Sequence, residues 1–276
     1  MERNYSIVIV GTGGQGVIRA SSVIGHAVLN SDKDYKLRTA ETHGMAQRGG
    51  SVIVHLRFGP DVESPLVKVN SADVLMSFEL VESIRYIDYL KKDGVLLVNN
   101  EIIIPPVLFR GQHVDVDPQI CIGCGNCKTN CYVNNNYYHS KSLAVIDQPA
   151  SKISNGICRI LSGCTGCKIC IGTCSREAIK LVREIRYPSF DEINELIKQA
   201  SKNNFIIHAS ELAKELGDIR MTNIVMIGAM IGLNVVPLNS DSIKQAIENV
   251  FNPKVVEMNI KALEAGIQLI KKIKKN

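Results

Sequence analysis

This chain of 276 residues lacks three features, and each absence excludes a class of protein. The longest apolar run, over 223–236, falls short of the ~20 residues that a membrane span requires. No arginine-rich arm or stripe accompanies the formal net charge of +5, which argues against a nucleic-acid partner. The first residues lack the basic region, apolar stretch and cleavage site of a secretory signal. We therefore expect a cytoplasmic protein that binds neither membranes nor nucleic acid.

Cysteine is also absent from most of the chain, because all nine cysteines lie between Cys121 and Cys174. The cytosol keeps thiols reduced, so these cysteines do not indicate a disulfide framework. We expect them to form a distinct module that binds metal or takes part in redox chemistry. With 45% hydrophobic and 21% charged residues, the chain as a whole has the composition of a folded globular protein.

Outside that segment, the hydrophobic pattern alternates between strands and helices. A β-branched run over 5–10 passes through a glycine-rich turn into a helical pattern. Further strands are predicted over 35–42, 51–59 and 95–100, with a helical stretch ending near residue 90. This alternation predicts an α/β fold with a mostly parallel sheet and helices on both faces.

The α/β pattern is interrupted and then resumed. Pro105 and Pro106 stop it, and it begins again near residue 186. We therefore predict one discontinuous domain over 1–106 and 186–276, with residues 107–185 inserted as a separate module.

The resumed part contains clear helix signals. Ser189 and Glu192 have the spacing of a capping box at the start of a helix. The segments 220–236 and 241–275 are predicted to be helical, and the lysine-rich tail suits a helix C-terminus because cations complement the helix dipole there.

Eight of the cysteines form two identical motifs, C-x2-C-x2-C-x3-C. In bacterial ferredoxins with this spacing, the first three cysteines of one motif and the fourth of the other bind the same cluster. The spacing predicts a ferredoxin-like module with two [4Fe-4S] clusters. The first cluster is assigned to Cys121, Cys124, Cys127 and Cys174, and the second to Cys164, Cys167, Cys170 and Cys131.

Two other interpretations of the cysteines were weighed. Structural zinc prefers two separated C-x2-C pairs, and a zinc scaffold remains the alternative to iron. Cys158 lies outside both motifs and is interpreted as a small core residue rather than a ligand.

The glycine-rich turn contains Gly11, Gly13, Gly14 and Gly16 in the pattern G-x-G-x-x-G. Between a strand and a helix, this pattern is typical of a loop that binds a dinucleotide pyrophosphate at the helix N-terminus. No acidic residue about 20 positions further on is clearly placed to bind a ribose. The alternative is that the glycines only permit a tight turn.

A second polar loop, over 41–52, follows the second strand at the edge where open α/β sheets bind ligands or partners. It contains His43, Gln47 and Arg48, which suit contact with an anion or a neighbouring subunit. A solvated connector is the alternative.

At these segments the sequence resembles the gamma-type subunits of the 2-oxoacid:ferredoxin oxidoreductases, and within them the beta subunits of the indolepyruvate branch. The resemblance covers about 1–106 and 186–276. It rests on the strings IVIVGTGGQGV, ETHGMAQRGGSVIVHLRFG, SPLV, SADVLMSFELVESIRYIDYL and NNEIIIPP, and on YPSFDEI, ELAKELG and TNIVMIGAM after the cysteine segment.

The resemblance implies a Rossmann-like subunit of a hetero-oligomer, docked on a catalytic subunit that binds thiamine diphosphate and Mg. Such a complex oxidatively decarboxylates a 2-oxoacid, forms acyl-CoA from CoA and passes electrons to external ferredoxin. This chain has no G-D-G…N-N thiamine-diphosphate motif, so no catalytic residue is assigned to it. The resemblance also lowers the expectation that the glycine loop binds NAD, and it suggests that His43, Gln47 and Arg48 lie at the subunit interface near a carboxylate or a CoA phosphate.

We therefore expect an electron-transferring subunit that acts on indolepyruvate or another arylpyruvate. A pyruvate or branched-chain 2-oxoacid oxidoreductase subunit is one alternative. An iron–sulfur electron-transfer protein linked to NAD or FAD through the glycine loop is another.

Overall fold

The computed structural model describes residues 3–43, 50–103, 113–131, 134, 151–160, 169–183 and 187–274. It divides into two compact units, Met1–Ile103 with Pro188–Asn276 and Ile104–Tyr187, which we call unit 1 and unit 2. The boundaries expected from the sequence, after residue 106 and before residue 186, lie within about three residues of these.

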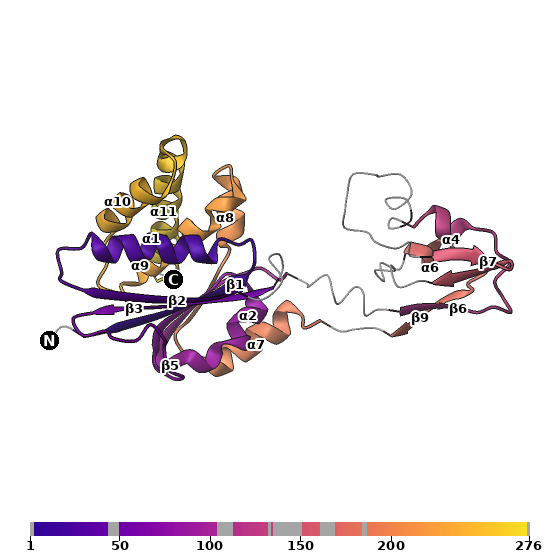
Figure 1. Cartoon of the computed structure of the whole chain (residues 1–276), viewed down its shortest axis with the longest axis horizontal. Helices are drawn as coiled ribbons and strands as arrows, with labels where there is room; N and C mark the ends of the chain where they lie inside the picture. The colour runs from indigo at the N-terminus through magenta and orange to yellow at the C-terminus, as the bar shows by residue number, and fades with distance from the viewer. Residues whose placement is uncertain are drawn as a thin grey trace. The chain divides into compact units, whose positions relative to one another are not determined.

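Unit 1 is built on a six-stranded sheet whose strands lie in the order β10-β5-β4-β1-β3-β2 (Figure 1). The neighbours from β10 to β1 are parallel, whereas β3 pairs antiparallel with both β1 and β2. The strands are β1 (Tyr5–Thr12), β2 (Lys36–His43), β3 (Ser51–Gly59), β4 (Ala72–Ser77), β5 (Leu90–Asn99) and β10 (Asn204–Ile207).

The antiparallel part corrects the expectation that strands and helices alternate throughout. Residues 44–50 join β2 to β3, and this connection is shorter than the dozen or more residues that a parallel crossover requires. The two strands therefore form an antiparallel pair, and the sheet is mixed rather than uniformly parallel.

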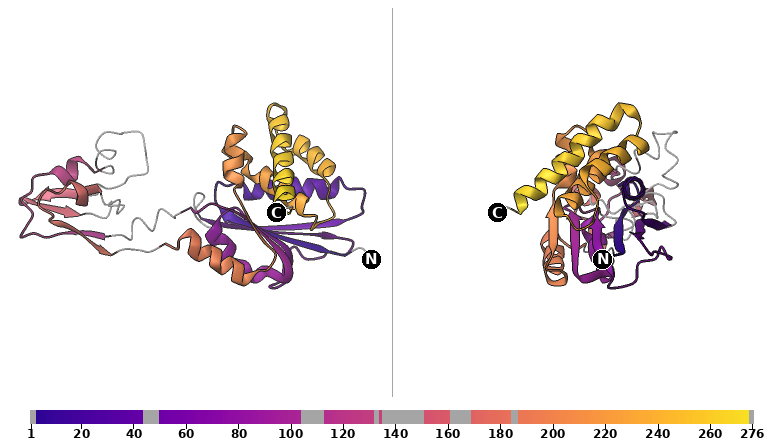
Figure 2. Two further views of the ribbon diagram at one scale, coloured as in Figure 1. Left: turned by 180° about the vertical axis from the view of Figure 1, so that it is seen from behind. Right: turned by 90° about the vertical axis from the view of Figure 1, so that its left-hand side faces the viewer.

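Helices cover both faces of this sheet, as predicted (Figure 1), and Figure 2 shows the same layers from behind. Strand β1 explains the arrangement, because successive side chains of a strand point to opposite faces. Ile7 and Ile9 belong to one core cluster, and Val8 and Val10 belong to the other. The first face carries α1 (Val17–Leu29), α8 (Ala209–Glu215), α9 (Thr222–Leu233), α10 (Ser240–Val250) and α11 (Pro253–Ile273), and the second carries α2 (Leu80–Arg85) and α7 (Phe190–Ala200).

Helix α9 contains most of the long apolar run seen in the sequence and lies buried against α11. The two helices approach so closely that a Cβ atom at Gly228 would overlap the Leu263 carbonyl oxygen, and one at Gly266 would overlap that of Val225. In the part of the chain that the structure describes, no helix is long and apolar enough to cross a membrane.

The helix signals after the interruption are confirmed. The Ser189 side chain accepts from the Glu192 backbone N–H and the Glu192 side chain accepts from the Ser189 backbone N–H, so the predicted capping box is confirmed. Lysines occupy the last turn of α11. The helical character expected over 241–275 is confirmed as two helices, α10 and α11, and Pro253 begins the second of them.

Unit 2 contains short elements only. Strands β6 (His113–Val116) and β9 (Ile179–Arg183) form one antiparallel pair, and β7 (Ser151–Ser154) and β8 (Ile157–Ile160) form a hairpin. The hairpin turns at Asn155 and Gly156, both with positive φ, as a two-residue turn of this kind requires. Helices α4 (Asn126–Thr129) and α6 (Ile169–Thr173) complete the described elements.

Candidate functional site

The glycine loop connects the end of β1 to the start of α1. Gly14 has φ +105° and Gly16, the residue before α1, has φ +79°, so both adopt left-handed conformations that favour glycine. Gln15 fastens the loop: its Oε1 accepts from the Thr12 backbone N–H at 2.8 Å, and its Nε2 donates to the Phe78 carbonyl at 2.9 Å. The loop is therefore held rigidly against β4, with the first turn of α1 behind it.

The start of α9 packs against the same loop. A Cβ atom at Gly16 would lie 2.9 Å from Asn223 Nδ2, so glycine is required there by space as well as by conformation. Asn223 is 3% exposed, and its Oδ1 has no hydrogen-bond partner in the part of the chain that the structure describes. A buried acceptor left unpaired costs about 1–3 kcal/mol, which marks this amide as an unsatisfied group.

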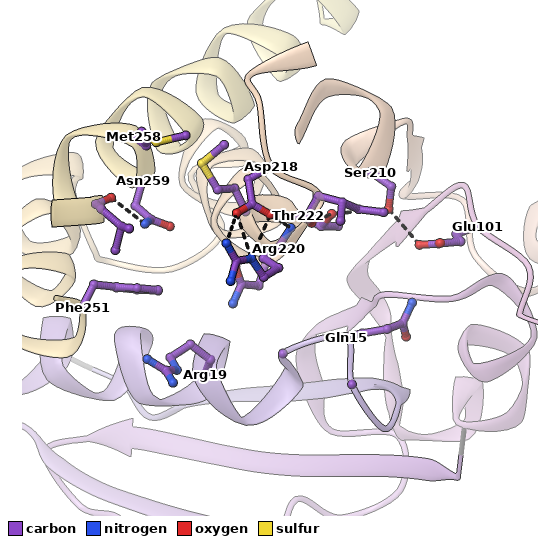
Figure 3. A pocket seen from close by; sticks show the side chains of 16 residues that line it. Gln15, Arg19, Glu101, Ser210, Asp218, Arg220, Thr222, Phe251, Met258 and Asn259 are labelled. Atoms are coloured by element: carbon purple, nitrogen blue, oxygen red, sulfur yellow. Dashed lines mark hydrogen bonds and ion pairs between the residues drawn. The ribbon is translucent and has the colours of Figure 1, made fainter. Parts of the chain in front are cut away.

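Between the glycine loop and the helices above it lies a cavity of about 450 Å³ (Figure 3). This volume is within the range of small-molecule sites. Arg19, from α1, and Arg220, from the short helix η2 (Ile219–Met221), line it, and so does Asn223. Phe251 closes one side, with the Arg19 guanidinium 5.3 Å from its ring centre.

The two arginines differ in their partners. Arg220 is bound to Asp218, with Nε 2.8 Å and 3.0 Å from the two carboxylate oxygens, and this pairing raises the pKa of the guanidinium and lowers that of the carboxyl. Among the described residues, Arg19 makes only a long 3.5 Å hydrogen bond to the Val250 carbonyl besides its contact with Phe251. Arg19 is therefore the cation better placed to meet an incoming anion.

The opposite end of the cavity is polar. Ser210 donates to Glu101 Oε2 at 2.8 Å, and Thr222 Oγ1 lies 3.4 Å from Ser210 Oγ (Figure 3). The cavity thus has a cationic end at the α1 N-terminus and a hydroxyl-rich end that includes one carboxylate. Such an arrangement suits an elongated ligand with an anionic group at one end.

The structure brings the two predicted loops together at their backbones. The Gly13 N–H donates to the Gly50 carbonyl at 2.8 Å, and Thr12 pairs with Ser51 in the sheet. His43 ends β2, but Gln47 and Arg48 lie outside the described residues. Their predicted interface role therefore stays a prediction.

Beside this loop lies a polar cluster that the sequence did not reveal. Glu82 is buried and accepts hydrogen bonds from Ser51 Oγ at 2.5 Å and Arg85 Nε at 3.0 Å. Glu79 caps α2 by accepting from the Glu82 N–H, and burial raises the pKa of its carboxyl. The only signal in the sequence is the presence of two glutamates within an apolar stretch.

The far side of the cavity was also missed. Arg220, Thr222 and Asn223 come from a segment that the sequence presented only as an apolar helix. A weak signal for this side of the cavity is that Thr222 and Asn223 are polar residues at the start of an otherwise apolar helix.

In unit 2, the four cysteines assigned to the first cluster, Cys121, Cys124, Cys127 and Cys174, line one pocket together with Cys158. Gly123 and Gly125 in the same loop have φ +65° and +85°. The rest of the lining includes the apolar Ile122, Ile153 and Ile179 together with the polar Asn126 and the cation of Arg176. This donor set suits an iron–sulfur cluster, which is bound by thiolates.

The second predicted set of cysteines lies only partly within the residues that the structure describes. Within them, no group of three or more cysteine, histidine or carboxylate side chains is arranged to hold a metal ion. Cys131 and Cys170 of the second predicted set are described, whereas Cys164 and Cys167 are not. Burial, together with a hydrogen bond to Cys127, raises the pKa of the Cys158 thiol to about 12.

The glycine loop with its cavity and the thiol-lined pocket of unit 2 are thus the two candidate sites of the chain. The chain belongs to the pyruvate ferredoxin/flavodoxin oxidoreductase family, whose model matches residues 6–157 and 155–269. It is thus a subunit of an oxidoreductase and not an enzyme by itself.

Relatives at the level of sequence carry more particular names. The chain is 31% identical to the indolepyruvate oxidoreductase subunit IorB of Pyrococcus horikoshii and to that of Thermococcus kodakarensis, in each case over 98% of both chains. It is 34% identical to the 2-oxoglutarate synthase subunit KorC of Methanothermobacter thermautotrophicus over 38% of this chain and 54% of that one.

Two solved structures support the fold. The gamma subunit of a keto/oxoacid ferredoxin oxidoreductase from Geobacter sulfurreducens matches with a TM-score of 0.53 at 17% identity over 98% of both chains. The 2-oxoglutarate:ferredoxin oxidoreductase of Magnetococcus marinus, with 2-oxoglutarate, coenzyme A and succinyl-CoA bound, matches with a TM-score of 0.54 at 15% identity, covering 98% of this chain and 31% of that one. At these identities the likeness concerns the fold alone.

Proposed function

We propose that this chain is the electron-transferring subunit of a thiamine-diphosphate-dependent indolepyruvate, or other arylpyruvate, ferredoxin oxidoreductase. Support comes from the relatives named as indolepyruvate oxidoreductase subunits, which are matched over nearly their whole length. In this proposal, thiamine diphosphate and Mg belong to a partner subunit of the hetero-oligomer, where the 2-oxoacid is decarboxylated. CoA is the co-substrate and external ferredoxin the electron acceptor.

In this proposal, the cavity of unit 1 binds a phosphate-bearing part of CoA. The observation that supports it is the convergence of the α1 N-terminus, Arg19 and the unsatisfied amide of Asn223 on one cavity. Backbone N–H groups of the first turn of α1 have no partners within the helix, so they can donate to a phosphate. Arg19 neutralises its charge, and Asn223 Oδ1 accepts a hydrogen bond from a ligand hydroxyl or amide.

The cysteines of unit 2 are proposed to bind the clusters that transfer the electrons. Cys121, Cys124, Cys127 and Cys174 are proposed to hold one [4Fe-4S] cluster, and Cys164, Cys167, Cys170 and Cys131 the other. When bound, such a cluster accepts and releases one electron at a time. The thiolates fix its position, and the apolar side chains of Ile122, Ile153 and Ile179 limit its contact with water.

The complex can be tested by anaerobic co-purification with candidate partner subunits, followed by a screen of 2-oxoacids with CoA and ferredoxin. We expect a thiamine-diphosphate subunit to co-purify and arylpyruvates to be the preferred substrates. Absence of such a partner would contradict the proposal. Reduction of the isolated chain by NADH would instead support the nicotinamide-linked alternative.

The cavity can be tested within the same complex through Arg19. Replacing it in Arg19→Ala removes a charged hydrogen-bond donor, and we expect the KM for CoA to rise about tenfold with little change in kcat. Arg38→Ala, at an exposed position of β2, is the matched control and should leave both constants unchanged. An unchanged KM for CoA in Arg19→Ala would exclude the cavity as the CoA site.

A further inference from the structure

The hairpin formed by β7 and β8, residues 151–160, lies between the two cysteine motifs in sequence and packs on the first of them in space. Its closest approach is at Gly156, whose carbonyl oxygen leaves no room for a Cβ atom at Gly123. The loop that carries Cys121 and Cys124 and the turn of the hairpin are thus in backbone contact. Glycine at position 123 is required by this contact as well as by its positive φ.

The hairpin is also fixed to the helix that carries Cys127. Asn134 is 1% exposed and joins the two parts: its Nδ2 donates to Ser151 Oγ at 2.9 Å and to the Lys128 carbonyl at 3.4 Å, while its Oδ1 accepts from the Ser151 N–H at 3.2 Å. Ile153 and Cys158 of the hairpin line the same pocket as the first set of cysteines. The hairpin is therefore a wall of that pocket.

Besides the hydrogen bond of the Cys158 thiol to Cys127, the backbone of the hairpin also reaches a predicted ligand atom directly. The backbone N–H of Cys158 donates to Cys121 Sγ at 3.4 Å. Residue 158 pairs with Ile153 across the hairpin, and its N–H points away from that partner toward the first motif. The donor is thus free of the hairpin's own ladder and available to the sulfur.

We propose that this hairpin tunes the redox centre held by the first cysteine set, by donating the Cys158 N–H to the Cys121 sulfur and by covering the pocket with apolar side chains. The proposal rests on the proposed function, because it assumes a [4Fe-4S] cluster at Cys121, Cys124, Cys127 and Cys174. Hydrogen bonds to the sulfurs disperse the extra negative charge of the reduced state and raise the reduction potential. The Cys158 N–H therefore raises the potential of one cluster, and the two clusters are inequivalent.

Two variants of the same residue separate the backbone donor from the thiol. Cys158→Pro removes both the N–H and the thiol without removing a ladder hydrogen bond, whereas Cys158→Ala removes the thiol and keeps the N–H. In the intact complex, redox titration followed by EPR should show a lower midpoint potential for one cluster in Cys158→Pro and an unchanged potential for the other. Cys158→Ala loses the hydrogen bond from its thiol to Cys127 but keeps the N–H, so it should retain the full iron content and change the potential less than Cys158→Pro does.

A measurement on the wild-type complex covers the case in which Cys158→Pro does not fold. Exchange into D2O should shift the Fe–S stretching bands of one cluster in the resonance Raman spectrum, and a shift should persist in Cys158→Ala, which keeps the N–H. Unchanged potentials in a fully loaded Cys158→Pro, unshifted bands in D2O, or loss of iron in Cys158→Ala would each overturn the proposal. Wild-type protein that holds zinc and no sulfide would instead overturn the proposed function itself.

Discussion

Units 1 and 2 reach a folded state by different means. Unit 1 buries aliphatic side chains on both faces of a six-stranded sheet, and the backbones of its helices α9 and α11 are in close contact. The described core of unit 2 is a small cluster in which two of the five buried residues are cysteines: Val114, Val116, Cys127, Cys158 and Ile179. A module this small usually needs a metal or another cross-link. Packing thus accounts for unit 1, whereas in unit 2 the proposed clusters would supply the cross-links that a small core requires.

The largest expected effect comes from removing one predicted ligand of unit 2. Cys124→Ala should lower the iron content from about eight to about four atoms per chain, because each cluster contains four irons. Hydrogen exchange should become faster in unit 2, because metal binding and folding are expected to be coupled there. It should stay unchanged in unit 1. Cys158→Ala is the matched control and should keep all the iron. Faster exchange in both units would remove the distinction between them.

The converse change tests packing in unit 1. Gly266→Ala places a methyl group against the Val225 carbonyl, so we expect the free energy of unfolding of unit 1 to fall by about 1–3 kcal/mol. Denaturant titration measures this change, and the iron content should not alter. Glu257→Ala, at an exposed position of the same helix, should leave stability unchanged. Wild-type stability in Gly266→Ala would show that the two helices can separate without cost.

The smallest effect is a pH dependence confined to unit 1. Burial raises the pKa of Glu79 above its ordinary 4.5, so the folded state holds a proton that the unfolded state releases. The stability that Glu79 contributes is complete below about pH 4.5 and is lost as the pH rises through the raised pKa. As the pH rises above 4.5, the free energy of unfolding of the wild type should therefore fall relative to that of Glu79→Gln.

Glu63 provides the control of opposite sign. The hydrogen bond from Lys36 lowers the pKa of its carboxyl, so Glu63→Gln should remove a contribution that is present at higher pH and lost as the pH falls. Glu79 and Glu63 variants that responded to pH in the same direction would contradict these assignments.

Local signals in the sequence predicted much of unit 1. The capping box at Ser189 needs only residues three positions apart, and the two-faced character of β1 follows from a run of apolar residues longer than one face requires. The antiparallel placement of β3 could not be read in this way, because it depends on the length of a connection and on pairing between β1 and β3, which are distant in sequence.

Only part of the candidate site could be predicted from the sequence. The glycine loop could be predicted because its conformation requires glycine at particular positions. The first cysteine set lines one pocket, and its assignment to a cluster stays a prediction from ligand spacing. Asn223 and Arg19 were missed because their importance comes from a cavity that forms only when α9 packs beside α1. Sequence patterns predict local geometry well, but they do not show which residues distant in sequence line the same cavity.

The central claim is that unit 2 is the electron-carrying part of an oxidoreductase subunit. Its most direct test is the metal and acid-labile sulfide content of the anaerobically purified complex, assigned to this chain. We predict about eight irons and eight sulfides per chain, in two EPR-distinguishable [4Fe-4S] clusters. Zinc without sulfide would contradict the claim and leave unit 2 as a structural scaffold.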